Sequence, residues 1–162
     1  MIEFRNPYSI IPPGSSKQIL PHPKKEYGSV ELAIFQEHRF AFFYWLRWTK
    51  KLQNNPPCLV SLDWHQDLCF PCDTEKQWLA ELDQSNSGDV AVFSWAKLAG
   101  NNDGHILSAA YLNLIGDIYG KTHQVASNSF VPVGSPILLV FCSITLSAGR
   151  IRSILISSAR SS

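Results

Sequence analysis

Three residues with metal-binding chemistry occur at alternate positions in the chain: Asp63, His65 and Asp67. Side chains alternate faces along an extended segment, so these three can project to one side while Trp64 and Gln66 project to the other. Two crowded carboxylates raise each other's pKa, and a divalent cation removes this cost by keeping both ionised. The pattern therefore indicates a metal site. Polar residues that are merely solvated at a strand end, or a helix cap at Asp67, would give the same spacing.

An apolar run at residues 59–62 precedes this cluster and predicts the buried strand that positions it. Open α/β sheets bind ligands at the ends of their strands, which favours the metal interpretation. An earlier apolar run at residues 30–35 predicts another strand, and His38 follows it. The aromatic run at residues 40–48 has helical spacing and a basic end, so it predicts a helix that is buried on more than one face.

Later segments extend the same alternation of strands and helices. Helices are predicted at residues 76–82 and 105–114 and a strand from residue 115, whereas residues 90–95 fit a strand or a short helix. This order predicts an α/β fold, with a parallel sheet and flanking helices on both faces. Residues 1–28 are rich in proline and turn formers, which predicts an irregular N-terminal lead-in.

These motifs follow one another in a specific order. His38 comes after one strand, the aspartate–X–histidine–X–aspartate motif comes after the next, and Asp103-Gly104-His105 precedes the run at residues 115–119. In this order they resemble the arginase–deacetylase superfamily, and most closely its uncharacterised arginase-like branch. The resemblance covers about residues 28 to 120 and implies an arginase–deacetylase-like sheet.

The resemblance also implies a set of metal ligands. By it, His38 and Asp67 hold one ion, His65 holds a second, and Asp63 bridges both. The ions are manganese in ureohydrolase members, and a single zinc serves in deacetylase members. Oxygen and imidazole ligands suit either metal.

The activity that the resemblance implies is metal-dependent hydrolysis of a carbon–nitrogen bond in a guanidino or acylated substrate. In the ureohydrolase members, a water between the ions becomes the nucleophile that attacks a guanidine or amidine carbon. His105 stands where superfamily members place a substrate-side histidine, which implies a role in proton transfer. A histidine that only meets solvent or a carbonyl at a helix start is the alternative for this position.

The chain departs from the superfamily after Asp117. The superfamily has a later aspartate–X–aspartate pair whose first member bridges the ions, yet none of the thirteen acidic residues of this chain follows Asp117. We therefore predict a lead-in at residues 1–28, a partial, truncated arginase-like α/β domain at 29–120 and an atypical serine-rich tail at 121–162. A frameshift or a truncation followed by unrelated sequence would produce such a tail. We expect weak binding of manganese or zinc at best, and little or no catalysis.

Cys69 and Cys72 form a competing constellation. A cysteine–X–proline–cysteine segment that follows a strand and opens a helix resembles a thioredoxin-type redox site, where the helix N-terminus lowers the pKa of the first thiol. Leu68 replaces the tryptophan that usually precedes that thiol, and a single cysteine pair of this spacing is more often two incidental thiols. The alternative functions are thus a thiol-disulfide oxidoreductase and a non-enzymatic interaction module with an unfinished sheet edge.

Composition narrows the class of protein. An apolar fraction of 45% and a charged fraction of 17% are typical of a globular domain. A net charge of +1 gives no electrostatic reason to expect a nucleic-acid partner, and no apolar run reaches the roughly 18 residues of a membrane span. No signal-peptide pattern follows Met1, so we expect a cytoplasmic location without membrane partners. The four cysteines are then expected to be free thiols: Cys58, Cys69, Cys72 and Cys142. Substrate and oligomeric state stay open.

Overall fold

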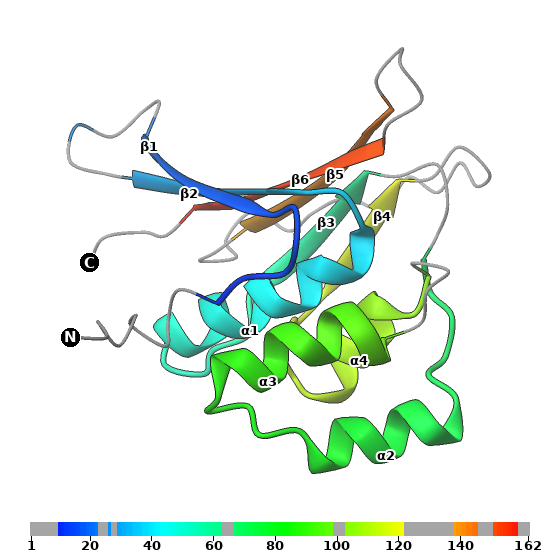
Figure 1. Ribbon diagram of the computed structural model, residues 1–162. Coiled ribbons are helices and arrows are strands. Elements are labelled where there is room, and N and C mark those ends of the chain that lie inside the picture. Colours follow the sequence, from blue (N-terminus) through cyan, green and yellow to red (C-terminus); the bar gives the residue numbers. More distant parts are fainter. Residues whose placement is uncertain are drawn as a thin grey trace, which may run out of the picture.

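The computed structural model describes residues 10–22, 26, 29–62, 67–98, 103–121, 138–145 and 151–158, the last two ranges and residues 120–121 by their backbone alone. Within these ranges, six strands form one sheet in the order β1-β2-β6-β5-β3-β4, and the helices lie on one face of it (Figure 1). The strands are β1 (Ser16–Pro21), β2 (Ser29–Phe35), β3 (Cys58–Leu62), β4 (Ile118–Lys121), β5 (Leu138–Thr145) and β6 (Ile151–Ser158). The helical elements are η2 (His38–Phe40), α1 (Ala41–Lys51), α2 (Asp73–Glu81), α3 (Ser87–Val92), η3 (Phe93–Lys97) and α4 (His105–Tyr111).

The sheet is mixed, which corrects the prediction of a wholly parallel one with helices on both faces. β3 pairs in parallel with β4 and β5, whereas β6 is antiparallel to both β2 and β5, and β1 is antiparallel to β2. The links from β1 to β2 and from β5 to β6 are shorter than the dozen or more residues that a parallel crossover needs, so these neighbours must be antiparallel. The broader prediction of an α/β fold is confirmed.

Three of the strands lie in the segments that were predicted to be a lead-in and a tail. β1 lies inside the segment predicted to be irregular, so that prediction is wrong for residues 16–21. Its side chains are nearly all exposed, and an edge strand of this kind lacks the apolar alternation that identifies strands in sequence. β5 and β6 belong to the serine-rich tail, and their backbones complete the sheet between β2 and β3.

The aromatic helix α1 is buried on more than one face, as predicted. Its buried side chains are Ala41, Phe42, Phe43, Tyr44, Trp45, Leu46, Trp48 and Thr49. Figure 1 shows the reason, because α1 (cyan) lies between the sheet and the layer that contains α3 and α4. The helix ends where Gln53 and Asn54 adopt left-handed φ angles of 56° and 62°. Two prolines follow, and proline opposes helix in the residue before it.

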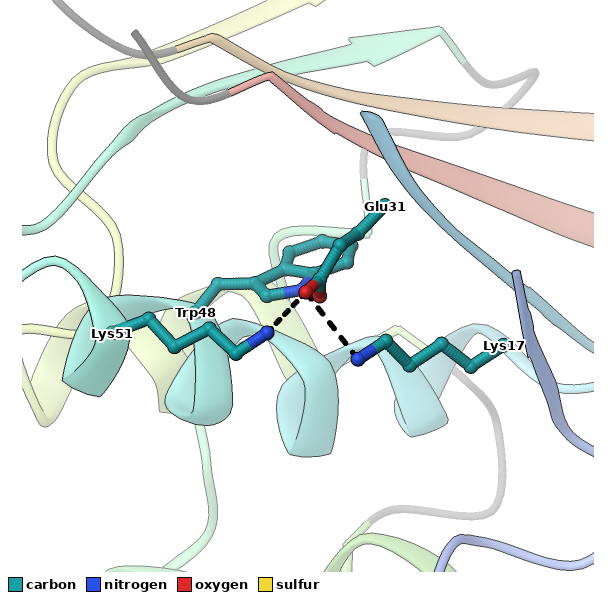
Figure 2. A network of polar contacts seen from close by, with 4 residues as sticks. All are labelled: Lys17, Glu31, Trp48 and Lys51. Atoms are coloured by element: carbon teal, nitrogen blue, oxygen red, sulfur yellow. Dashed lines mark hydrogen bonds and ion pairs between the residues drawn. The ribbon is translucent and has the colours of Figure 1, made fainter. Parts of the chain in front are cut away.

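Glu31 of β2 joins α1 to the outer strands of the sheet. Its carboxylate accepts a hydrogen bond of 2.6 Å from Trp48 Nε1, pairs with Lys51 of the same helix, and lies 3.3 Å from Lys17 Nζ of β1. Figure 2 shows how Trp48 and Lys51 from α1 and Lys17 from β1 converge on this one carboxylate. The contacts fix the end of α1 against the hairpin of β1 and β2.

The outer helical layer completes the core. Residues 90–95, which fitted either strand or helix, lie in α3 and in the π-helical turn η3 that continues it. Asn86 caps α3, since its Oδ1 accepts hydrogen bonds from the backbone N–H groups of Gly88 and Asp89. In the part of the chain that the structure describes, no helix has the length and apolar content that crossing a bilayer requires.

Candidate metal centre

The strand directions explain why His38 and Asp67 lie at one edge of the sheet. β2 and β3 run the same way, since β2 is antiparallel to β6, β6 is antiparallel to β5, and β5 is parallel to β3. Their carboxyl ends therefore face the same edge. Two strands separate them, which at about 4.8 Å a strand puts their ends about 14 Å apart. The residues that meet must therefore come from the segments that follow the strands.

His38 comes from the turn η2, directly after β2. The side chain is largely buried, at 9% exposure for the whole residue. Its Nδ1 lies 3.0 Å from Oδ2 of Asp67, a hydrogen-bonding distance between residues that are 29 positions apart in the chain. The structure thus brings together the two side chains that were predicted to share one ion.

Asp67 is held in an unusual backbone conformation. Its φ is 51°, in the left-handed region that aspartate tolerates better than most residues because its short side chain bonds locally. The residue is only 7% exposed, so the alternative of a merely solvated carboxylate is wrong here. The cap of α2 is Cys72, so Asp67 is not the helix cap either. A buried carboxylate in a costly conformation, paired with an imidazole, is typical of functional sites.

His105 begins α4 and is fully buried. Its ring stacks on Trp45 of α1, with centroids 5.5 Å apart and planes inclined by 15°, and it meets the His38 ring edge-on at 6.1 Å. The alternative of a solvent-facing histidine at this helix start is therefore wrong. Because a backbone hydrogen bond of 3.0 Å joins Cys69 N–H to the Asp103 carbonyl, the chain after Asp67 is tied to the segment that opens α4.

The separation of the His38 and Asp67 atoms fits two ligands of one ion. Ligand atoms that each lie about 2.1 Å from a metal, at a right angle, are about 3 Å from each other. An imidazole nitrogen and a carboxylate oxygen suit manganese or zinc. Among the residues that the structure describes, no group of three or more histidine, cysteine or acidic side chains is arranged to hold a metal. The other predicted ligands, Asp63 and His65, lie outside the described residues.

The cysteine pair next to this site does not have the electrostatics of a thioredoxin-type centre. Asp103 raises the pKa of Cys69 above its usual value, mainly through a side-chain hydrogen bond and also through the negative charge of its carboxylate. A reactive first thiol needs the opposite shift. Cys72 is the N-cap of α2, and its backbone N–H donates to Glu75 Oε2 at 3.0 Å. Cys58, Cys69 and Cys72 are free thiols, as expected, and the side chain of Cys142 lies outside the described part.

Sequence pattern missed the role of Trp45 at this site. Helical spacing assigned it to the core, which is correct, since it is fully buried. Nothing in the spacing indicates that the core face of α1 also supports a histidine from α4, because that contact joins residues 60 positions apart.

Comparisons with family models, curated proteins and solved structures found no match to this chain. The geometry of His38, Asp67 and His105 is therefore the evidence that bears on function.

Proposed function

We propose that the protein is an arginase-like, metal-binding α/β protein, related by descent to metal-dependent hydrolases of carbon–nitrogen bonds and itself impaired in catalysis. His38 and Asp67 are ligands of one divalent ion, manganese or zinc. Asp63 and His65 complete the ligand set. The substrate class would be guanidino or acylated small molecules.

The contact between His38 and Asp67 carries this proposal. It joins the segment after β2 to the segment after β3 at the edge where α/β sheets bind ligands. A bound divalent ion supplies Lewis-acid polarisation of the group to be hydrolysed. The chain itself buries and supports the His38 ligand, because Trp45 packs against His105 and His105 packs against His38.

Two features argue for impairment. No acidic residue follows Asp117, so the later aspartate pair of the superfamily has no counterpart in this chain. In addition, the two strands between β2 and β3 are β5 and β6, which come from the atypical serine-rich tail and not from the arginase-like segment at residues 29–120. With fewer carboxylates around the ion, binding should be weak and a nucleophile poorly held. His105, whose ring centroid lies 6.1 Å from that of His38, would transfer protons at such a site but would then have little to act on.

Metal analysis of the purified chain tests the proposal. In equilibrium dialysis against increasing concentrations of Mn²⁺ or Zn²⁺, the wild type should bind about one ion weakly, as measured by plasma mass spectrometry. His38→Gln, Asp63→Asn, His65→Gln and Asp67→Asn should each lower the affinity at least about tenfold, since even outer-shell substitutions cost that much. Asp73→Asn is the matched control, because its side chain is fully exposed in the first turn of α2.

The outcome separates the proposal from its alternatives. Equal metal affinity in all five variants, or no binding by the wild type at millimolar metal, would contradict the proposal. A dithiol at Cys69 and Cys72 that reacts reversibly with oxidised glutathione and ignores chelators would support an oxidoreductase instead. The absence of both metal binding and a redox-active dithiol would favour an interaction module. A cytoplasmic location is part of the proposal, because the described cysteines are free thiols.

A further inference from the structure

A pocket of about 210 Å³ lies between α1 and the segment that leads into α3. It shares no lining residue with the candidate metal centre. Phe43, Leu46 and Val90 line it, and all three side chains are almost wholly buried. These side chains give the pocket an apolar floor.

The same pocket is lined by three cations of α1: Arg47, Lys50 and Lys51. Positions 46 and 47 each lie three or four residues from both position 43 and position 50, so the four side chains share one face of the helix. That face is apolar at Phe43 and Leu46 and basic at Arg47 and Lys50. Within the described residues, no carboxylate lines the pocket.

The two lysines have partners at the rim. Lys50 donates to the backbone carbonyl of Gln84, and Lys51 pairs with Glu31 in the network of Figure 2. Arg47 differs from both, because its guanidinium carbon lies 5.5 Å over the ring of Phe43, on the pocket floor. A guanidinium in this position presents planar donors that match a carboxylate in a two-bond geometry.

Stabilisation of the helix end does not account for Arg47. Basic side chains favour the last turn of a helix, and Lys50 and Lys51 occupy that turn. Arg47 lies a turn earlier and is half-buried. The positive potential also extends to β1, where burial lowers the pKa of Lys17 and the charges of Lys51 and Arg47 lower it further against the opposing effect of Glu31.

We propose that this pocket binds a small organic anion with an apolar body and one carboxylate. The apolar body would lie against Phe43, Leu46 and Val90, and the carboxylate would bind Arg47 with support from Lys50. A pocket of this volume, below the roughly 300 Å³ of typical drug-sized sites, fits a short-chain acid better than a nucleotide.

Calorimetric titration of the full chain with hexanoate tests this site. Hexanamide has the same shape without the charge, and inorganic phosphate has the charge without the apolar body. Hexanoate should bind at least about tenfold more tightly than either, and Arg47→Gln should weaken hexanoate binding about tenfold, since one charge-assisted hydrogen-bond pair is of that size. Lys50→Gln should weaken it by a smaller factor.

Lys97→Gln is the matched control. Lys97 carries the same charge but lies over Trp78, 5.7 Å from the ring, and does not line the pocket. Its loss should leave hexanoate binding unchanged. Equal binding of hexanoate and hexanamide, equal binding of phosphate, or an equal effect of Arg47→Gln and Lys97→Gln would each overturn the proposal. Absence of hexanoate binding at millimolar concentration would overturn it as well.

Discussion

The two ends of α1 hold polar groups in opposite surroundings. Just before the helix begins, His38 contacts Asp67 inside the fold, and the two residues are 9% and 7% exposed. At the other end, Lys51 pairs with Glu31 near the surface, and 51% of the lysine side chain is exposed. Buried polar groups lose more than exposed ones when a partner is removed. One helix therefore joins a region where single substitutions are costly to a region where they are mild.

The difference follows from how each region is covered. Near His38, the aromatic face of α1 and the start of α4 exclude water, so polar groups must satisfy one another. Near Lys51, water remains available to replace a lost partner. The contrast therefore predicts that substitutions near His38 lower the free energy of unfolding more than substitutions near Lys51 do.

Trp45→Ala should have the largest effect. The side chain is fully buried and stacks on His105, so its removal leaves a cavity and should lower the free energy of unfolding by about 3–5 kcal/mol. Urea denaturation measures the change. Trp95→Ala is the matched control, since Trp95 is 50% exposed and its loss should cost much less. Should Trp45→Ala fail to fold, Trp45→Phe keeps most of the volume and should give a smaller loss. Equal effects of Trp45→Ala and Trp95→Ala would contradict the contrast.

Asp67 substitutions should come next. Asp67→Ala removes the partner of His38 and puts a β-carbon without local bonding at a φ of 51°, so it should cost about 2–4 kcal/mol. Asp67→Gly relieves the backbone and should cost about 1–3 kcal/mol, since only the lost contact remains. Thermal and urea denaturation of the alanine and glycine variants separate the cost of the lost His38 contact from the cost of the backbone strain. If the glycine variant is no more stable than the alanine variant, the left-handed backbone contributes no strain.

Sequence pattern predicted the parts of this fold that depend on local periodicity. The helix α1, the strands β2, β3 and β4 and the helix α4 follow from apolar spacing and turn residues, because each buries a patterned face. The resemblance to the arginase–deacetylase superfamily, rather than periodicity, implied that His38 and Asp67 hold one ion. The contact between them is observed, and their role as ligands stays a prediction.

The rest depends on contacts that periodicity does not encode. The place of β5 and β6 between β2 and β3 depends on pairing between strands that are 80 or more residues apart in the chain, and β1 is an exposed edge with no apolar pattern. The raised pKa of Cys69 comes from Asp103, a residue 34 positions later, whereas the motif alone indicated a lowered one. In each case a non-local neighbour decided the outcome.

Glu31→Gln should have the smallest effect of the three. Burial raises the pKa of Glu31, but hydrogen bonds from Lys51 and Trp48 and the charges of Lys51 and Lys17 outweigh it, so the pKa lies below its usual value. The carboxylate therefore adds stability above its unfolded-state pKa, and this contribution is lost as the pH falls through the lower folded-state pKa. Because solvent screens the half-exposed Lys51, the loss at pH 7 should be about 1 kcal/mol. Urea denaturation of wild type and variant from pH 7 to pH 3 should show the difference shrinking with acid. A difference that stays constant over that range would mean that Glu31 acts through packing rather than through its charge, and the two ends of α1 would then differ less than their exposure suggests.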